Sequence, residues 1–144
     1  MGKKRIVTKS GQRVDRGLKS RSVARTPRKK LSKGILYVES TYNNTKLSFT
    51  DKNGNVVIWS SSGALGFKGA KKGTPFAAAK IGELVGEKAK IMGVTEADVI
   101  VRGVGSGRES AIRGFASQGI TLEKIQDKTP VPHNGPRPPK PRRV

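Results

Sequence analysis

The positive charge of this chain is concentrated at its two ends, and this limits which part of it can fold. Residues 1–33 hold 13 Lys/Arg and one acid, for a net charge of +12. Residues 34–128 carry +4 and residues 129–144 a further +4, which completes the formal net charge of +20. Like charges at this density repel one another in a compact state. We therefore expect one folded domain over 34–128, between a basic arm with no regular structure of its own and a basic tail.

A net charge of +20 on 144 residues favours a polyanionic partner. Nucleic acid fits, because lysine and arginine release the counterions condensed on its phosphates. A membrane is not expected as a partner, since no segment approaches the roughly 20 apolar residues of a spanning helix and the basic stretches lack an apolar face. The composition of the arm also leaves an organelle transit peptide open, because such leaders are basic and poor in acids too.

The sequence has no cysteine and only one histidine, His133. The lack of cysteine excludes disulfides, thiolate metal sites and a cysteine nucleophile. One histidine cannot form a histidine-rich metal cluster. We expect no metal, no cofactor and no catalytic residue.

The first half of the domain has the pattern of a three-stranded meander. Residues 35–41 are nearly continuously apolar at their start, which is typical of a central strand. Residues 45–50 alternate between apolar and polar side chains, as a half-buried strand does. The pair Asn53-Gly54 marks a tight turn before a third strand at 56–60. The three strands are expected to pair antiparallel.

The second half of the domain alternates between helix and strand. A Thr-Pro cap and a closing glycine predict a helix within 74–93. A strand at 97–102 leads to a second helix, for which Ser106 and Glu109 are expected to form a capping box. A last strand is expected at 120–125. Two strand–helix–strand units after a meander predict an α/β domain with one five-stranded mixed sheet covered by helices.

The loop at 61–74 interleaves glycine with Lys68, Lys71 and Lys72. Glycine lets the backbone approach a ligand and present its N–H groups, and lysine supplies charge. The length and charge of the loop favour contact with RNA over the alternative, a flexible solvated loop. Phe67 in this loop can stack on a base or pack into the core, and we favour packing.

The turn at 103–108 joins a strand to a helix start, where free N–H groups and the helix dipole attract anions. A dinucleotide-binding turn is similar, but Arg108 stands where its third glycine would be, and only one such unit exists. We therefore expect Gly105, Gly107 and Arg108 to contact phosphate, with Arg113 extending the contact. The alternative is that Arg108 pairs with a neighbouring carboxylate.

Two other functions compete with RNA binding. A metal-dependent nuclease needs several carboxylates around paired metals, and Glu39, Glu83 and Glu87 are the candidates. The fourth strand ends without an acid, and Glu83 and Glu87 fit better as a solvated helix face with Lys80 and Lys90. A basic chromatin-like protein is the second alternative, and it would bind duplex DNA and structured RNA equally well.

The tail at 129–144 holds six of the eight prolines and four basic residues. Such a chain is extended and semi-rigid. It is well suited to lying along phosphates, and His133 can stack or hydrogen-bond in RNA. The pair Asn134-Gly135 is a turn signal.

Several short motifs occur in order along the domain and tail. They are Tyr42-Asn43-Asn44-Thr45, Gly66-Phe67-Lys68-Gly69, Thr74-Pro75-Phe76-Ala77-Ala78, Gly107-Arg108-Glu109-Ser110 and Pro132-His133-Asn134-Gly135. With the ending Arg137-Pro138-Pro139-Lys140 and Arg142-Arg143-Val144, the chain closely resembles the bacterial-type small-subunit ribosomal protein eleven family from about residue 34 to its end. The arm at 1–33 is unlike the common pattern of that family, so its contacts cannot be transferred.

The resemblance implies a three-layer α/β/α fold of ribonuclease H-like topology without the catalytic acids. It implies a non-enzymatic, cytoplasmic constituent of the platform of the small ribosomal subunit, although an organelle ribosome stays open. There the family bridges several helices of the small-subunit ribosomal RNA and helps to form the cleft for the Shine–Dalgarno duplex of the message. Implied neighbours are small-subunit proteins seven and eighteen and translation initiation factor three. By position, the expected RNA contacts are Asn43, Asn44, Lys68, Lys71, Lys72, Gly105, Gly107, Arg108, Arg113, His133, Asn134, Arg137, Lys140, Arg142 and Arg143.

Overall fold

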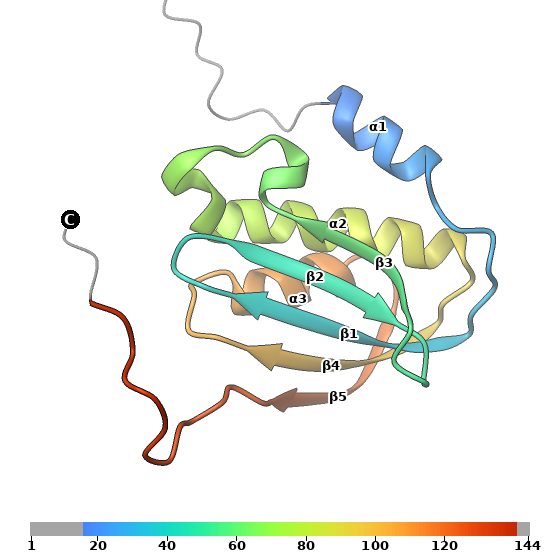
Figure 1. Ribbon diagram of the computed structural model, residues 1–144. Helices are drawn as coiled ribbons and strands as arrows, with labels where there is room; N and C mark the ends of the chain where they lie inside the picture. Colours follow the sequence, from blue (N-terminus) through green and yellow to red (C-terminus); the bar gives the residue numbers. More distant parts are fainter. Residues whose placement is uncertain (1–15, 141–144) are drawn as a thin grey trace, which may run out of the picture.

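A five-stranded mixed sheet organises the computed structural model, which describes residues 16–140 (Figure 1). The strand order is β3-β2-β1-β4-β5. β2 pairs antiparallel with β1 and β3, whereas β4 pairs parallel with β1 and β5. The predicted mixed sheet of five strands is therefore confirmed. The strands are β1 (Lys33–Ser40), β2 (Thr45–Thr50), β3 (Val56–Ser61), β4 (Glu96–Arg102) and β5 (Thr121–Asp127).

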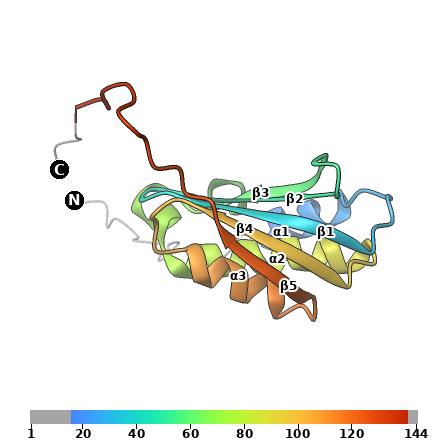
Figure 2. The same cartoon turned by 90° about the horizontal axis from the view of Figure 1, so that it is seen from below.

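The helices α2 (Pro75–Ile91) and α3 (Arg108–Ala116) lie on the same face of the sheet (Figure 2). This follows from the topology, because both right-handed crossovers step in the same direction across the sheet. The two helices pack closely: a Cβ atom on Gly82 would lie 2.3 Å from the carbonyl oxygen of Ala111. The described residues form no second helical layer on the opposite face, so the expected α/β/α layering is not observed within 16–140.

The helix ends agree only in part with the expectations. Thr74 caps α2 as predicted, because its Oγ1 accepts a hydrogen bond from the Ala77 N–H at 3.3 Å. The predicted capping box of α3 is wrong. Gly107 is the N-cap residue and makes no side-chain cap, while the Ser106 hydroxyl donates to the Gly73 carbonyl at 3.0 Å. The Ser106 hydroxyl thus contacts a loop that is distant in sequence instead of capping α3.

The core lies between the helix-covered face of the sheet and the two helices. Along β1 the buried residues alternate with half-buried ones, so one face of the strand packs inward and the other is only partly covered. Phe49 of β2 packs against Phe115 of α3, with 6.0 Å between ring centroids. Other fully buried members of this core are Leu36, Val38, Leu47, Ile81, Leu84 and Val85.

From residue 16 the arm is folded onto the domain, although no regular structure was expected before residue 34. Helix α1 (Arg16–Ala24) contacts α2. Lys19 pairs with Glu87 of α2 at 3.5 Å, and Val23 and Leu31 pack against the core. The Leu31 N–H also donates to the Met92 carbonyl at 3.2 Å. The arm residues 1–15 lie outside the described residues.

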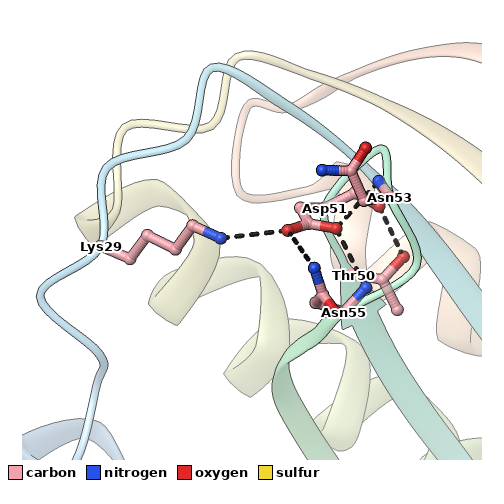
Figure 3. A network of polar contacts seen from close by, with 5 residues as sticks. All are labelled: Lys29, Thr50, Asp51, Asn53 and Asn55. Atoms are coloured by element: carbon pink, nitrogen blue, oxygen red, sulfur yellow. Dashed lines mark hydrogen bonds and ion pairs between the residues drawn. The ribbon is translucent and has the colours of Figure 1, made fainter.

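A polar network ties the arm to the turn between β2 and β3 (Figure 3). The Asp51 carboxylate accepts from the Lys29 ammonium at 3.0 Å, and from the backbone N–H groups of Asn53 and Asn55 at 2.9 and 3.0 Å. The Asn55 amide adds a bond at 3.1 Å. These donors, Lys29 foremost, lower the pKa of Asp51 to about 2. The tight turn predicted at Asn53-Gly54 is confirmed, with Gly54 at φ +90°.

Candidate nucleic-acid interface

Three loops and the start of the tail meet at one end of the sheet, where β1 and β4 end (Figure 1). They are the β1–β2 turn at 41–44, the 3-10 helix η2 (Gly69–Gly73), the β4–α3 turn at 103–107 and the tail start at 128–130. We call these residues the loop end. Most of the expected RNA-contact residues within the domain belong to it or directly follow it.

Close backbone contacts hold the loop end together. The Gly105 N–H donates to the Ser40 carbonyl at 2.9 Å. A Cβ atom on Gly73 would lie 2.3 Å from the Tyr42 carbonyl oxygen, so only glycine fits there. Gly105 and Gly107 are both buried. Their role in the described chain is to let the loops approach one another, and the Gly105 N–H is already paired.

The tail is anchored where it leaves the loop end. The Lys128 N–H donates to the Val101 carbonyl at 2.9 Å, and the Thr129 hydroxyl accepts from the Gly103 N–H at 3.2 Å. From residue 130 the described side chains are exposed, and the tail runs away from the body of the domain (Figures 1 and 2). The expected contacts His133, Asn134, Arg137 and Lys140 lie on this exposed stretch, whereas Arg142 and Arg143 lie outside the described residues.

Arg108 forms an ion pair with Asp127 at the end of β5. Hydrogen bonds from the Thr129 hydroxyl, the Thr129 N–H and Arg108, in that order, lower the pKa of Asp127 to about 2. Arg108 therefore pairs with a carboxylate, which is the alternative that the sequence left open. Arg113 pairs with Glu109 at 3.5 Å, but both side chains are more than 80% exposed. Such a surface pair contributes little and is readily exchanged for a phosphate.

The glycine–lysine loop is more ordered than a flexible loop. It contains two 3-10 helices, η1 (Gly63–Leu65) and η2. Phe67 packs as predicted, because it is 9% exposed and meets Phe76 edge-on at 6.1 Å. Lys68 and Lys71 are exposed on the loop, and Lys72 is half-buried. The loop therefore presents its lysines from a backbone with 3-10 turns.

Asn43 and Asn44 lie in the β1–β2 turn. Asn43 is exposed, while the Asn44 carbonyl accepts from the Thr41 N–H at 2.8 Å. The side-chain oxygen of Asn44 is buried and has no hydrogen-bond partner in the described part of the chain. Such an unpaired buried acceptor is uncommon in folded proteins.

Two aromatic residues near these loops were not among the expected contacts. Tyr42 precedes Asn43 in the turn and is 80% exposed. Phe76, in the first turn of α2, is half exposed, and the Lys80 ammonium lies 5.7 Å from its ring centroid. Exposed aromatic rings beside cations are suited to stacking on unpaired bases. For Tyr42, the signal in the sequence was its place directly before the two asparagines.

The carboxylates considered for a nuclease are engaged elsewhere. Glu39 pairs with Lys46 at 3.1 Å and with Arg102 at 3.7 Å. Glu83 pairs with Lys80 at 2.9 Å, as a solvated helix face requires, and Glu87 pairs with Lys19 of α1. Within residues 16–140, no group of three acids or histidines could hold a metal ion. No helix of that same range has the length and apolar character to cross a membrane.

Comparison with known families gives one finding. A family model described as ribosomal protein S11 matches residues 34–143. The match covers the whole sheet except Lys33, both covering helices, the loop end and nearly all of the tail. Helix α1 and the rest of the arm lie outside it.

Proposed function

The chain belongs to the ribosomal protein S11 family, and on that basis we propose that its loop end and tail bind small-subunit ribosomal RNA on the platform of the subunit. Members of this family are ribosomal RNA-binding, structural constituents of the small ribosomal subunit that serve translation. The observation that carries the finer proposal is the convergence of the β1–β2 turn, η2, the β4–α3 turn and the tail start at one end of the sheet. No other end of the sheet gathers so many of the expected contacts.

Within the loop end, the residues take different parts. Lys68, Lys71 and Lys72 neutralise phosphates from the loop that contains η1 and η2. Tyr42 stacks on an unpaired base, and Asn43 hydrogen-bonds to a base edge or a ribose. Gly105 and Gly107 act indirectly, because their small size lets the loops close together.

Arg108, Arg113 and Asn44 complete this interface. Arg113 exchanges its exposed partner Glu109 for phosphate. Arg108 is held by Asp127 in the free protein, so its contact with RNA requires that pair to open or to be shared. The buried side-chain oxygen of Asn44 accepts a hydrogen bond from RNA once the RNA reaches it.

The tail makes the second part of the interface. His133, Asn134, Arg137 and Lys140 are exposed on a proline-rich strand that begins at a fixed point. Arg142 and Arg143 extend the charge. Binding of one RNA helix at the loop end and another along the tail joins separate helices of the ribosomal RNA.

The wider setting is proposed from the family. The chain acts in the cytoplasm, helps to form the cleft for the Shine–Dalgarno duplex, and lies near small-subunit proteins seven and eighteen and initiation factor three. We also assign it a ribonuclease H-like topology without catalytic acids. The strand order β3-β2-β1-β4-β5 with β2 antiparallel supports this assignment.

The salt dependence of RNA binding tests whether the tail binds RNA. Truncation after Pro130 keeps the contact between Gly103 and Thr129 and removes four basic residues. We expect the slope of log affinity against log salt to fall in magnitude by about 3, since each phosphate neutralised contributes ~0.7 to 0.9. A second variant keeps the full tail with all four basic residues changed to glutamine. Its slope should fall by the same amount, because the charge and not the length of the tail is responsible. An unchanged slope in both variants would refute the binding of RNA by the tail.

A further inference from the structure

A groove of about 430 Å³ lies where the arm meets the edge of the sheet. Residues from α1, from the edge strand β3 and from α2 line it. Among residues 16–140, its charged lining residues are Arg21, Arg25 and Lys88, and none of its lining residues is acidic. Arg21 and Arg25 are exposed at its mouth, and the hydroxyl-bearing Ser22 and Ser60 also line it.

Lys88 is unusual among the described lysines. The residue is only 7% exposed, and its ammonium makes no hydrogen bond or ion pair with any described residue. The nearest acid in sequence, Glu87, is paired with Lys19 instead. Burial lowers the pKa of the Lys88 ammonium. Placing a cation in a largely buried position without a carboxylate partner is costly, and proteins tend to break such local rules at functional sites.

We propose that this groove binds a phosphate group of an RNA strand, with Lys88 at its base and Arg21 and Arg25 at its mouth. Phosphate fits better than a carboxylate, because its additional oxygens can accept from three cations at once. Trp59 also lines the groove and is 64% exposed, so an aromatic side chain is available to the nucleotide that carries the phosphate. The choice of RNA as the source of phosphate rests on the proposed function, whereas the anion site itself rests on the groove.

This site is an addition to the family interface. Arg21, Ser22 and Arg25 lie in the arm, outside the matched residues 34–143. The groove exists only because α1 is docked beside β3 and α2. It therefore gives the arm, whose contacts the family does not supply, a defined place on the ribosomal RNA.

The fluorescence of Trp59 tests the proposal, because it is the only tryptophan of the chain. The full-length protein is titrated with inorganic pyrophosphate, with a uridine hexanucleotide and, as a contrast, with a hexaglutamate peptide. In the wild type, both phosphate probes should change the signal and saturate. Lys88→Met should raise their half-saturation concentrations about tenfold or more, as expected for loss of a charged hydrogen bond. The double variant Arg21→Gln/Arg25→Gln should act in the same direction.

Lys90→Met is the matched control, because Lys90 is exposed on the same helix and loses the same charge. It should titrate like the wild type. Equal curves for the Lys88 and Lys90 variants, or no response of Trp59 to either phosphate probe, would overturn the site. A Lys88-dependent response to hexaglutamate alone would also overturn it, in favour of an acidic peptide beside the edge strand.

The two proposals fail in different ways. If small-subunit ribosomal RNA binds but the Trp59 response does not depend on Lys88, the groove is not a site and the proposed function stands. If phosphate probes bind through Lys88 but ribosomal RNA does not bind, the anion site stands and RNA is not its ligand. Thermal unfolding checks that Lys88→Met is folded, since removal of a charge that pairs with no described carboxylate should not lower its Tm.

Discussion

Asp51 is the residue whose ionisation is most clearly tied to the fold. Its folded pKa of about 2 lies below the ordinary value of 3.8. A depressed carboxyl pKa contributes stability above the unfolded pKa, and this contribution is lost as the pH falls from about 4 toward 2. The acid sensitivity of the turn and of the docked arm should therefore have a source in this one carboxylate.

We expect Asp51→Asn to lower Tm at neutral pH, because the amide loses the ion pair with Lys29. The difference in Tm from the wild type should shrink between pH 4 and pH 2, where the wild-type carboxylate takes up its proton. Differential scanning calorimetry from pH 2 to pH 7 measures this. Glu109→Gln is the control, since that side chain is exposed. A gap in Tm that stays constant over the whole pH range would show that Asp51 does not act through its charge.

For Lys88 we expect the opposite effect on Tm. Replacement of this largely buried lysine, which pairs with no carboxylate of the described residues, by the apolar side chain of Lys88→Met should raise Tm by about 3 °C, which corresponds to roughly 1 kcal/mol in a chain of this size. Lys90→Met should change Tm by less than about 1 °C. A lower Tm for the Lys88 variant, measured at low salt without RNA, would mean that the ammonium has a stabilising partner in the free protein.

At the scale of elements, the sequence predicted those whose determinants are local. Helix α2 has its cap, its proline and its closing glycine within its own sequence, and the meander has its alternation and its Asn-Gly turn. Helix α1 was not predicted, because its few apolar residues form no stripe and its stability comes from packing on α2. The start of α3 was misplaced for a related reason: the Ser106 hydroxyl bonds to Gly73, which is far away in sequence.

Docking of α1 should depend on two apolar contacts. The double variant Val23→Ser/Leu31→Ser removes the side chains that pack against the core, so the arm should open and trypsin should cut after Arg21 and Arg25 about tenfold faster. The core domain should stay resistant. Leu18→Ser, at a more exposed position of the same helix, serves as the control. Equal cleavage of the double variant and the wild type would show that the arm is held by other contacts.

At the scale of the whole molecule, the sequence patterns predicted the strands of the sheet better than the layers around it. The sheet of five strands and the exposed tail follow from patterns within the sequence. Sequence patterns could not predict that the described residues form only one helical layer. The number of layers depends on the direction in which both crossovers step across the sheet. Likewise, motif positions named the loop-end residues, but only the fold reveals that Gly105 is buried while Tyr42 is exposed.

The whole chain should prefer structured ribosomal RNA to duplex DNA. A surface that combines fixed lysines with exposed aromatic rings recognises unpaired bases as well as phosphates, and duplex DNA offers it only phosphates. In competition binding at about 0.15 M salt, small-subunit ribosomal RNA should displace the protein from DNA at concentrations at least about tenfold lower than DNA of equal length requires. Equal potency would favour a general basic protein of the chromatin type.

The anchoring of Thr129 to Gly103 gives the tail a definite origin. An extended proline-rich chain advances about 3.1 Å per residue, so the ten residues from 131 to 140 span roughly 30 Å, about the diameter of a small domain. The backbone of Lys140 therefore lies about that far from the β4–α3 turn when the tail is extended, and its side chain reaches further. The length of the tail therefore sets how far from the loop end its described part can carry a second segment of RNA.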